Sequence, residues 1–152
     1  MAIIMQHIYI VTPCYNAAAT LGRTLESIIA QQGIVLRYHV QDAASTDGSQ
    51  DILASFATRI ADDPGRYSHI EFSWSSEPDA GLYDGISRAF SALSIPQDAL
   101  MGWLNADDTL CDGALALVCA AAADLTQCDW FGGVPRVIGE AGEVLAQGRI
   151  DF

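Results

Sequence analysis

Short apolar runs alternate along the chain with longer segments in which apolar residues recur every three or four positions. A short run is typical of a buried strand, and the longer recurrence is typical of a helix that packs one face on a core. The runs predict strands at about residues 8–11, 35–41, 69–74 and 100–104. The segments that follow them predict helices at about residues 21–32, 49–60, 83–93 and 112–124. Two more strands are expected at about 130–138 and 144–150, joined by a turn at 140–143.

Strands that alternate with helices indicate an α/β fold, a three-layer sandwich with a mainly parallel sheet. In the first predicted helix, Leu21, Leu25 and Ile28 lie on one face. Thr20 could cap the start of this helix, and Gly33 is expected to end it. We expect a single domain over residues 1–152, because a chain of this length suits one core.

The composition of the chain limits the kinds of binding partner and the cell compartment that we expect. The chain carries 19 acidic and 7 basic residues, a formal net charge of -12, and every base is Arg. Such a surface repels nucleic acid and anionic lipid, so we expect neither as a partner. No apolar run reaches the roughly 18 residues of a membrane span, and Met1 to Gln6 lacks the features of a signal peptide. We therefore expect a cytoplasmic protein with no membrane span.

Polar residues follow each of the first four predicted strands. They are Thr12-Pro13, Asp42, the segment Ser76 to Asp79, and Asp107-Asp108. The carboxyl ends of parallel strands meet at one edge of a sheet, which is where ligands bind in open α/β folds. Acidic residues from three strand ends would repel one another there, and a bound cation would remove that cost. The pattern therefore predicts one site at this edge.

Each candidate also has a structural interpretation. Asp107 and Asp108 can hold a hard cation, or they can cap the helix expected near Asp112. Asp42 can accept a hydrogen bond from a base or a sugar, or it can stabilise its own loop. Tyr15 can offer its ring to a planar base, or it can pack at the strand end.

The sequence gives little support for a glycine-rich phosphate loop, a catalytic triad or a zinc site. The chain has neither of the common glycine-rich phosphate loops, and no Ser-His-Asp or Cys-His arrangement is visible. The four Cys lack CxxC spacing, which argues against a zinc site. We interpret the cysteines as structural thiols, with Cys119 in the core, and the three His as structural. Asp47 is interpreted as a turn residue or a helix cap.

Residues 8–16 read IYIVTPCYN, residues 40–49 read VQDAASTDGS, residues 76–84 read SEPDAGLYD and residues 102–108 read GWLNADD. These four motifs resemble those of the family 2 glycosyltransferases. The last resembles a variant of the DxD metal motif. Residues 131–145 are more weakly similar to the hairpin of the family. The motifs occur in the family's order and span nearly the whole chain, so together they are highly specific.

The resemblance implies a GT-A fold and inverting transfer of a sugar from a nucleotide-diphosphate donor, with a UDP-sugar expected. The acceptor is an unknown sugar or lipid-linked molecule, and the expected context is the synthesis of cell-surface polysaccharide or glycoconjugate. The resemblance implies that Thr12, Pro13 and Tyr15 border the base and that Asp42 is hydrogen-bonded to it. It places Asp79 beside the nucleotide or sugar and Asp107 at the ribose or the donor sugar. It assigns the binding of Mg²⁺ or Mn²⁺ to Asp108.

The chain also departs from the family pattern. Ala43 and Ala44 replace two glycines, and Asn105 replaces the first aspartate of a strict DxD. Family members are usually much longer, and no residue here matches their general base. We expect the acceptor-side C-terminal part to be lacking, and an apolar edge left bare there could drive self-association. A truncated, non-catalytic nucleotide-sugar-binding module is therefore an alternative. A nucleotidyltransferase-like enzyme is a weaker one, because the chain has no Lys.

Overall fold

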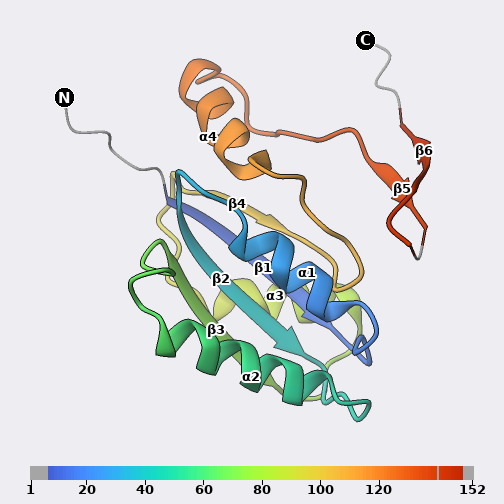
Figure 1. Cartoon of the computed structure of the whole chain (residues 1–152). Helices are drawn as coiled ribbons and strands as arrows, with labels where there is room; N and C mark the ends of the chain where they lie inside the picture. The colour runs from blue at the N-terminus through green and yellow to red at the C-terminus, as the bar shows by residue number, and fades with distance from the viewer. Residues whose placement is uncertain (1–6, 140, 149–152) are drawn as a thin grey trace. The chain divides into compact units, whose positions relative to one another are not determined.

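The computed structural model describes residues 7–139 and 141–148. Strands and helices alternate along most of this length (Figure 1). The elements are β1 (His7–Cys14), α1 (Leu21–Ile29), β2 (Val35–Asp42), α2 (Ser49–Asp62), β3 (Ile70–Ser76), α3 (Leu82–Ser91), β4 (Leu100–Trp103), α4 (Ala114–Asp124), β5 (Arg136–Ile138) and β6 (Val144–Gln147). Among the described residues, none of the helices has both the length and the apolar character needed to cross a membrane.

The chain divides into two compact units, Met1–Ala121 and Ala122–Phe152. The first unit contains a four-stranded sheet in the order β3-β2-β1-β4, and every pair in it is parallel. Helices α1 and α2 cover one face of this sheet, and α3 covers the other (Figure 1). The prediction of an α/β sandwich with a parallel sheet is therefore confirmed.

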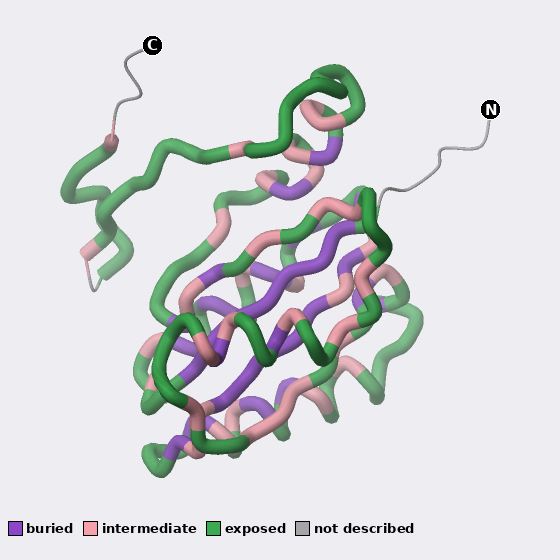
Figure 2. The backbone as a smooth tube through the Cα atoms, turned by 180° about the vertical axis from the view of Figure 1, so that it is seen from behind, coloured by how far each residue is buried: buried purple, intermediate pink, exposed green. Residues whose placement is uncertain are grey.

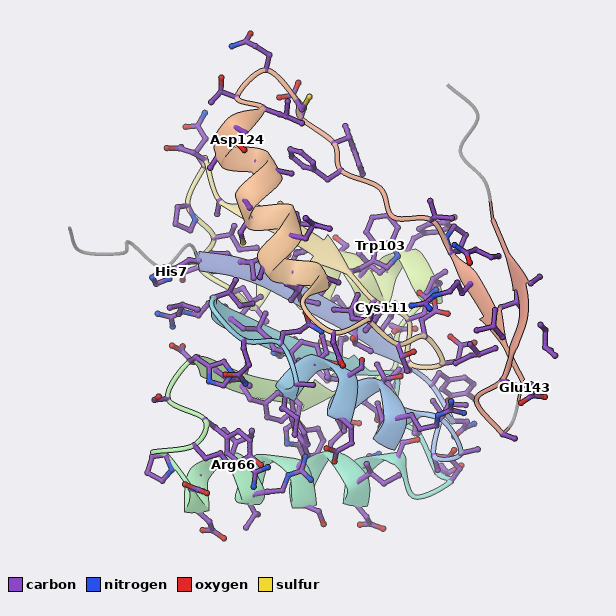
Figure 3. All side chains as sticks on the ribbon, turned by 45° about the horizontal axis from the view of Figure 1, so that its top comes forward. His7, Arg66, Trp103, Cys111, Asp124 and Glu143 are labelled. Carbon is purple, nitrogen blue, oxygen red and sulfur yellow. The ribbon has the colours of Figure 1, made fainter. Side chains whose placement is uncertain are left out.

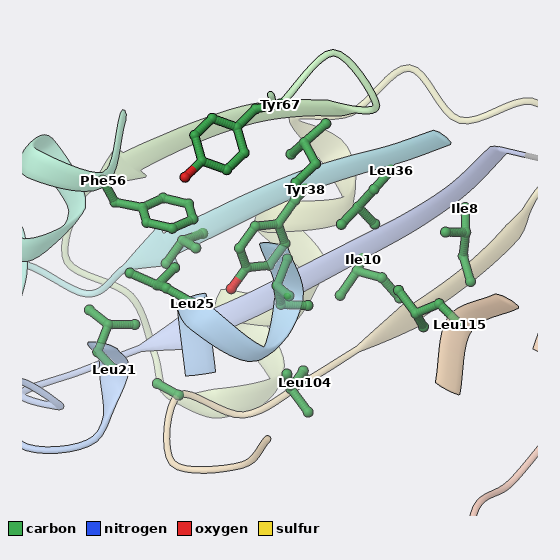
Figure 4. Close-up of a cluster of buried hydrophobic side chains, with 14 of the residues drawn as sticks. Ile8, Ile10, Leu21, Leu25, Leu36, Tyr38, Phe56, Tyr67, Leu104 and Leu115 are labelled. Atoms are coloured by element: carbon green, nitrogen blue, oxygen red, sulfur yellow. The ribbon is translucent and has the colours of Figure 1, made fainter. Parts of the chain in front are cut away.

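The core lies between the sheet and the layer formed by α1 and α2. Side chains of β1 and β2 that point to this face are buried, as are those on the facing side of α1 (Figure 4). Tyr38 lies at its centre, fully buried and packed against Phe72, with ring centroids 5.6 Å apart. Figure 2 shows burial concentrated along the central strands, whereas the outer turns of the helices are exposed. The packed core therefore holds the carboxyl ends of the central strands in fixed positions.

Two details of α1 differ from the prediction. The helix ends at Ile29, where Ala30 forms the C-cap, so Gly33 does not end it. The Thr20 side chain does not cap the helix, because its hydroxyl donates to the carbonyl of Ala17 at 3.3 Å. The polar residues that follow Ile29 are held by other parts of the fold, which local sequence signals do not show.

The second unit contains β5 and β6, which form an antiparallel hairpin. The strand expected from residue 130 begins only at Arg136, because Gly132, Gly133 and Pro135 are poor strand residues. The end of the second expected strand, residues 149 and 150, and the first residue of the expected turn, Glu140, lie outside the described residues. The hairpin residues are almost all exposed.

A cleft at the carboxyl ends of the strands

A cleft of about 940 Å³ lies in the first unit. Its walls come from the end of β1 and the loop after it (residues 13–17, 19 and 20), from residues 78, 79, 81 and 82 before and at the start of α3, and from residues 105–107 after β4, with Ala43 after β2. β1 connects through α1 to β2 on one side, and β4 lies on the other side of β1. The strand order reverses between β1 and β4, and such a switch point opens a crevice at the carboxyl edge of a parallel sheet.

Four of the predicted site residues line this cleft, namely Pro13, Tyr15, Asp79 and Asp107. Tyr15 is 67% exposed, so ordinary packing at the strand end does not explain it. Pro13 is buried at the end of β1 and forms part of the floor. The sheet topology therefore brings together residues that are more than ninety positions apart in the sequence, from Pro13 to Asp107.

Thr12 and Asp42, near the ends of β1 and β2, do not line the cleft. Both side chains are fully buried. The Thr12 hydroxyl accepts a hydrogen bond from the Tyr38 hydroxyl at 2.9 Å. The Asp42 carboxylate accepts hydrogen bonds from the backbone N–H of Ser45 at 3.0 Å, from the Ser45 hydroxyl and from the Ser76 hydroxyl at 2.6 Å. The structure thus shows the loop-stabilising contact of Asp42, and the expectation that acidic residues from three strand ends share one cleft holds only for Asp79 and Asp107.

Asp108 is exposed and lies next to the cleft without lining it. Its Oδ2 accepts a hydrogen bond from Nδ2 of Asn105 at 3.2 Å. The Oδ1 atom of Asn105 is buried and has no hydrogen-bond partner within the part of the chain that the structure describes. The alternative that Asp107 and Asp108 cap a helix is wrong, since α4 begins only at Ala114.

Helix α1 holds the segment that carries these residues, and it does so with polar side chains that sequence reasoning missed. Thr24, Ser27 and Gln31 lie along one stripe of α1 and its extension. The Thr24 hydroxyl donates to the backbone carbonyls of Ala106 (2.9 Å) and Asp108 (2.8 Å). The Ser27 hydroxyl accepts a hydrogen bond from the backbone N–H of Leu110 at 3.1 Å. Oε1 of Gln31 accepts one from the backbone N–H of Leu115 at 3.1 Å. The only sign of these contacts in the sequence is the row of polar residues beside the apolar face of the helix.

The segment before α3 is held in a similar way by the helix itself. Asp84 Oδ2 accepts hydrogen bonds from the backbone N–H of Ala80 and from Nε of Arg88, both at 2.9 Å. Arg88 also donates from Nη1 to the carbonyl of Pro78 at 3.2 Å. The Ala80 N–H, followed by the nearby guanidinium, lowers the pKa of Asp84. Arg88 is therefore engaged in bracing the loop, and the cleft lining contains no basic side chain.

Gly85 on α3 allows Asp79 to sit where it does. A Cβ atom at this position would lie 2.9 Å from Oδ2 of Asp79 and 3.4 Å from Cβ of Pro13. The other oxygen of Asp79 accepts a hydrogen bond from the backbone N–H of Gly81 at 2.9 Å. The Asp79 carboxylate is thus held against the first turn of α3, where partial positive charge at the helix N-terminus favours an anion.

The family model of glycosyl transferase family 2 matches residues 9–144. The chain belongs to glycosyl transferase family 2. This confirms the resemblance drawn from the four motifs, which all lie within the matched range apart from Ile8. A search of curated protein sequences finds no match to this chain.

Solved glycosyltransferases share the fold. The mannosyltransferase PcManGT from Pyrobaculum calidifontis, in complex with GDP-Man and Mn²⁺, is similar with a TM-score of 0.62 and 21% identity, over 77% of this chain and 32% of that one. S. aureus TarS is similar with a TM-score of 0.60 and 16% identity, over 80% of this chain and 20% of that one. TarS 1–349 in complex with UDP-GlcNAc gives a TM-score of 0.58 and 15% identity, over 88% and 40%. This family 2 chain has the GT-A fold, and it spans less than half the length of each of these structures.

The carboxylates in and beside the cleft of this family 2 domain fit a divalent cation whose other ligands come from a bound substrate. Within residues 7–139 and 141–148, no group of three or more His, Cys, Asp or Glu could hold a metal ion. Mg²⁺ is commonly bound through one or two carboxylates together with substrate phosphates. Asp107 in the cleft and Asp108 beside it provide such carboxylates. These residues therefore fit a cation that is shared with a bound diphosphate, and they do not form a closed cage.

Cys14 also lines the cleft, although its side chain is only 3% exposed. Burial, followed by the nearby charge of Asp42, raises the pKa of the Cys14 thiol to about 11. Because the thiolate is the nucleophilic form, a thiol with this pKa stays protonated and unreactive near neutral pH. The family 2 cleft therefore offers carboxylates, backbone groups and an aromatic ring, but no activated nucleophile.

Proposed function

We propose that this chain is the donor-binding domain of an inverting glycosyltransferase, acting on a nucleotide-diphosphate sugar. The observation that carries the proposal is the cleft itself. In a chain of family 2, it brings Pro13, Tyr15, Asp79 and Asp107 to the switch point of a parallel sheet. The cleft lies wholly within the first unit, and the proposal treats residues 1–152 as one nucleotide-sugar-binding domain.

The nucleoside would lie on the side of the cleft formed by the end of β1. The exposed ring of Tyr15 provides a face for a planar base, and Pro13 borders the floor beneath it. Thr12 and Asp42, which are buried near the ends of β1 and β2, would support this wall. The direct hydrogen bond between the base and Asp42 that the resemblance implies would require Asp42 to become accessible, because its carboxylate is fully buried behind the bonds that it accepts from Ser45 and Ser76.

The diphosphate would lie toward residues 105–108, where Asp107 would contact ribose or the donor sugar and Asp108 would bind Mg²⁺ or Mn²⁺. At a separation of about 6 Å and an effective dielectric constant of about 20, each pair of like charges costs roughly 3 kcal/mol. No basic side chain lines the cleft to offset this repulsion. Asp108 would hold a divalent cation here together with the phosphates, and such a cation would offset the negative charge of the departing diphosphate.

Asp79 would face the sugar side of the donor. The N–H of Gly81 holds its carboxylate at the start of α3, where Gly85 leaves room for it, so it presents a preset acceptor to a sugar hydroxyl. In the transfer, an acceptor hydroxyl attacks the anomeric carbon, a general base removes its proton and the nucleoside diphosphate departs. No residue of this chain matches the general base of the family, and we assign none.

The donor is proposed from the chemistry of the cleft and from the fold. Structures with the same fold hold GDP-Man with Mn²⁺, UDP-GlcNAc or UDP. A uracil or a guanine nucleotide would suit the exposed face of Tyr15, and a UDP-sugar remains our proposed donor. The acceptor would be a sugar or a lipid-linked molecule in the synthesis of cell-surface polysaccharide or glycoconjugate.

Titration calorimetry with UDP tests this proposal. We expect binding with Mn²⁺ present and little binding with a chelator, and we expect Asp108→Ala to remove most of the metal dependence. Asp112→Ala is the matched control, because Asp112 is an exposed acid outside the cleft lining. Equal affinity with and without Mn²⁺, or unchanged metal dependence in Asp108→Ala, would contradict the proposal. Binding of UDP-sugars without any transfer would instead fit a nucleotide-sugar-binding module.

A further inference from the structure

Two loops at the carboxyl edge of the sheet are joined by a set of reciprocal hydrogen bonds. One is the cleft loop, residues 15–20, and the other is the support loop, residues 43–49. Three consecutive backbone N–H groups of the cleft loop donate to side chains of the support loop. The bonds are Asn16 N to Ser45 Oγ (2.8 Å), Ala17 N to Ser49 Oγ (3.0 Å) and Ala18 N to Asp47 Oδ2 (2.8 Å). In return, Thr46 N donates to Asn16 Oδ1 (3.0 Å).

The accepting side chains are themselves fixed by carboxylates. The Ser45 hydroxyl donates to Asp42, which is fully buried. The Ser49 hydroxyl and backbone N–H donate to Oδ1 of Asp47 at 2.7 and 3.0 Å. Asp47 thus holds Ser49 with one oxygen and the cleft loop with the other. The hydrogen bond from the Ser49 hydroxyl, followed by that from the Ala18 N–H, lowers the pKa of the Asp47 carboxyl.

The arrangement fixes the wall of the cleft on which the nucleoside would lie. The cleft loop contributes Tyr15, Asn16, Ala17, Ala19 and Thr20 to the lining. Asn16 adopts a left-handed backbone conformation, with φ of 48°, which asparagine adopts more readily than most residues. The three captured N–H groups are also unavailable to phosphate, because each already has an acceptor. The loop therefore acts as a fixed wall and not as a phosphate-binding loop.

We propose that Asp47 is a positioning residue that holds the cleft loop in its nucleotide-binding arrangement. Asp47 is exposed and does not line the cleft, so its effect on a ligand would pass through Ala18 and Ser49. This role rests on the proposed function, since it concerns the binding of the same nucleoside diphosphate. It assigns to Asp47 more than the turn or cap that its position in the sequence suggests.

Asp47→Asn tests the role with a minimal change in shape. The amide offers one acceptor oxygen and one NH₂ group, so it cannot accept from both Ser49 and Ala18. We expect the affinity for UDP with Mn²⁺ to fall about tenfold, as fits the loss of a hydrogen bond to a charged acceptor. We also expect faster hydrogen exchange at the amides of residues 16–18, with the cooperative unfolding transition retained. Asp51→Asn, an exposed acid on the first turn of α2, is the matched control.

The outcomes separate the two claims. If the unmodified full chain binds UDP with Mn²⁺, and Asp47→Asn binds equally well or loses no more affinity than Asp51→Asn, the positioning role is overturned. Unchanged exchange at residues 16–18 in Asp47→Asn would also overturn it, because the bond from Ala18 would then not hold the loop. If the unmodified chain binds neither UDP nor GDP with Mn²⁺, the proposed function itself fails, and the role in binding fails with it.

Discussion

Ala44 occupies a backbone conformation that favours glycine. Its φ is 58°, in the left-handed region, where a Cβ atom comes close to the following carbonyl oxygen. The family has glycine at this position and at position 43, and this chain has alanine at both. Ala43 does not share the positive φ, so only one of the two replacements carries strain. The neighbouring hydrogen bonds that the backbone N–H and hydroxyl of Ser45 donate to Asp42 keep the loop in place despite that strain.

We therefore expect Ala44→Gly to increase the free energy of unfolding by about 1 kcal/mol, the usual cost of a left-handed alanine less the added freedom of the unfolded chain. Urea denaturation followed by circular dichroism measures the change. Ala43→Gly is the control and is expected to lower stability, because it adds freedom to the unfolded chain and relieves no strain. Equal effects of the two substitutions would show that Ala44 is not strained.

At the scale of single residues, the sequence predicted the candidates better than their roles. Tyr15 and Asp107 were expected in a site because each follows a strand, and strand ends converge in any parallel sheet. The burial of Asp42 could not be foreseen, since it depends on hydroxyls of Ser45 and Ser76 that only the fold brings to its two oxygens. Motif position alone does not distinguish a carboxylate that faces a ligand from one that fixes a loop.

At the scale of elements, helix α1 makes structural contacts with two of its faces. Its apolar face, with Leu21, Leu25 and Ile28, is buried in the core. Its polar stripe holds the backbone of the segment after β4. Apolar periodicity was sufficient to predict that this helix exists. The polar stripe was not interpretable from the sequence, because its partners lie about eighty residues further along the chain.

Thr24 is the part of this stripe closest to the proposed metal position. Thr24→Val keeps the shape of the side chain and leaves the carbonyls of Ala106 and Asp108 without their donor. We expect the free energy of unfolding to fall by about 1–3 kcal/mol, the usual cost of unsatisfied buried polar groups. Thr58→Val, on the exposed side of α2, is the control for the substitution itself. Equal losses for the two variants in urea denaturation would contradict a special role for Thr24.

At the scale of the whole molecule, alternating strands and helices predicted the parallel sheet but not where its order reverses. That reversal places β4 beside β1, and it brings the cleft loop next to residues 105–107. β4 is an outer strand of this sheet, and Trp103 on it is about half exposed (Figure 3). Because this chain spans less than half of each solved relative described above, its part in a whole enzyme is a proposal that rests on the cleft.

The most direct test of that proposal is to locate a bound Mn²⁺ ion by nuclear magnetic resonance. Paramagnetic Mn²⁺ broadens the amide signals of nearby residues, so substoichiometric Mn²⁺ with UDP reports the position of the site. We expect residues 105–108 and 78–82 to broaden first, and residues 63–69 between α2 and β3, at the opposite end of the sheet, to stay sharp. UDP should be required for this pattern. Broadening centred elsewhere, or the same pattern without UDP, would contradict a nucleotide-dependent metal site in this cleft.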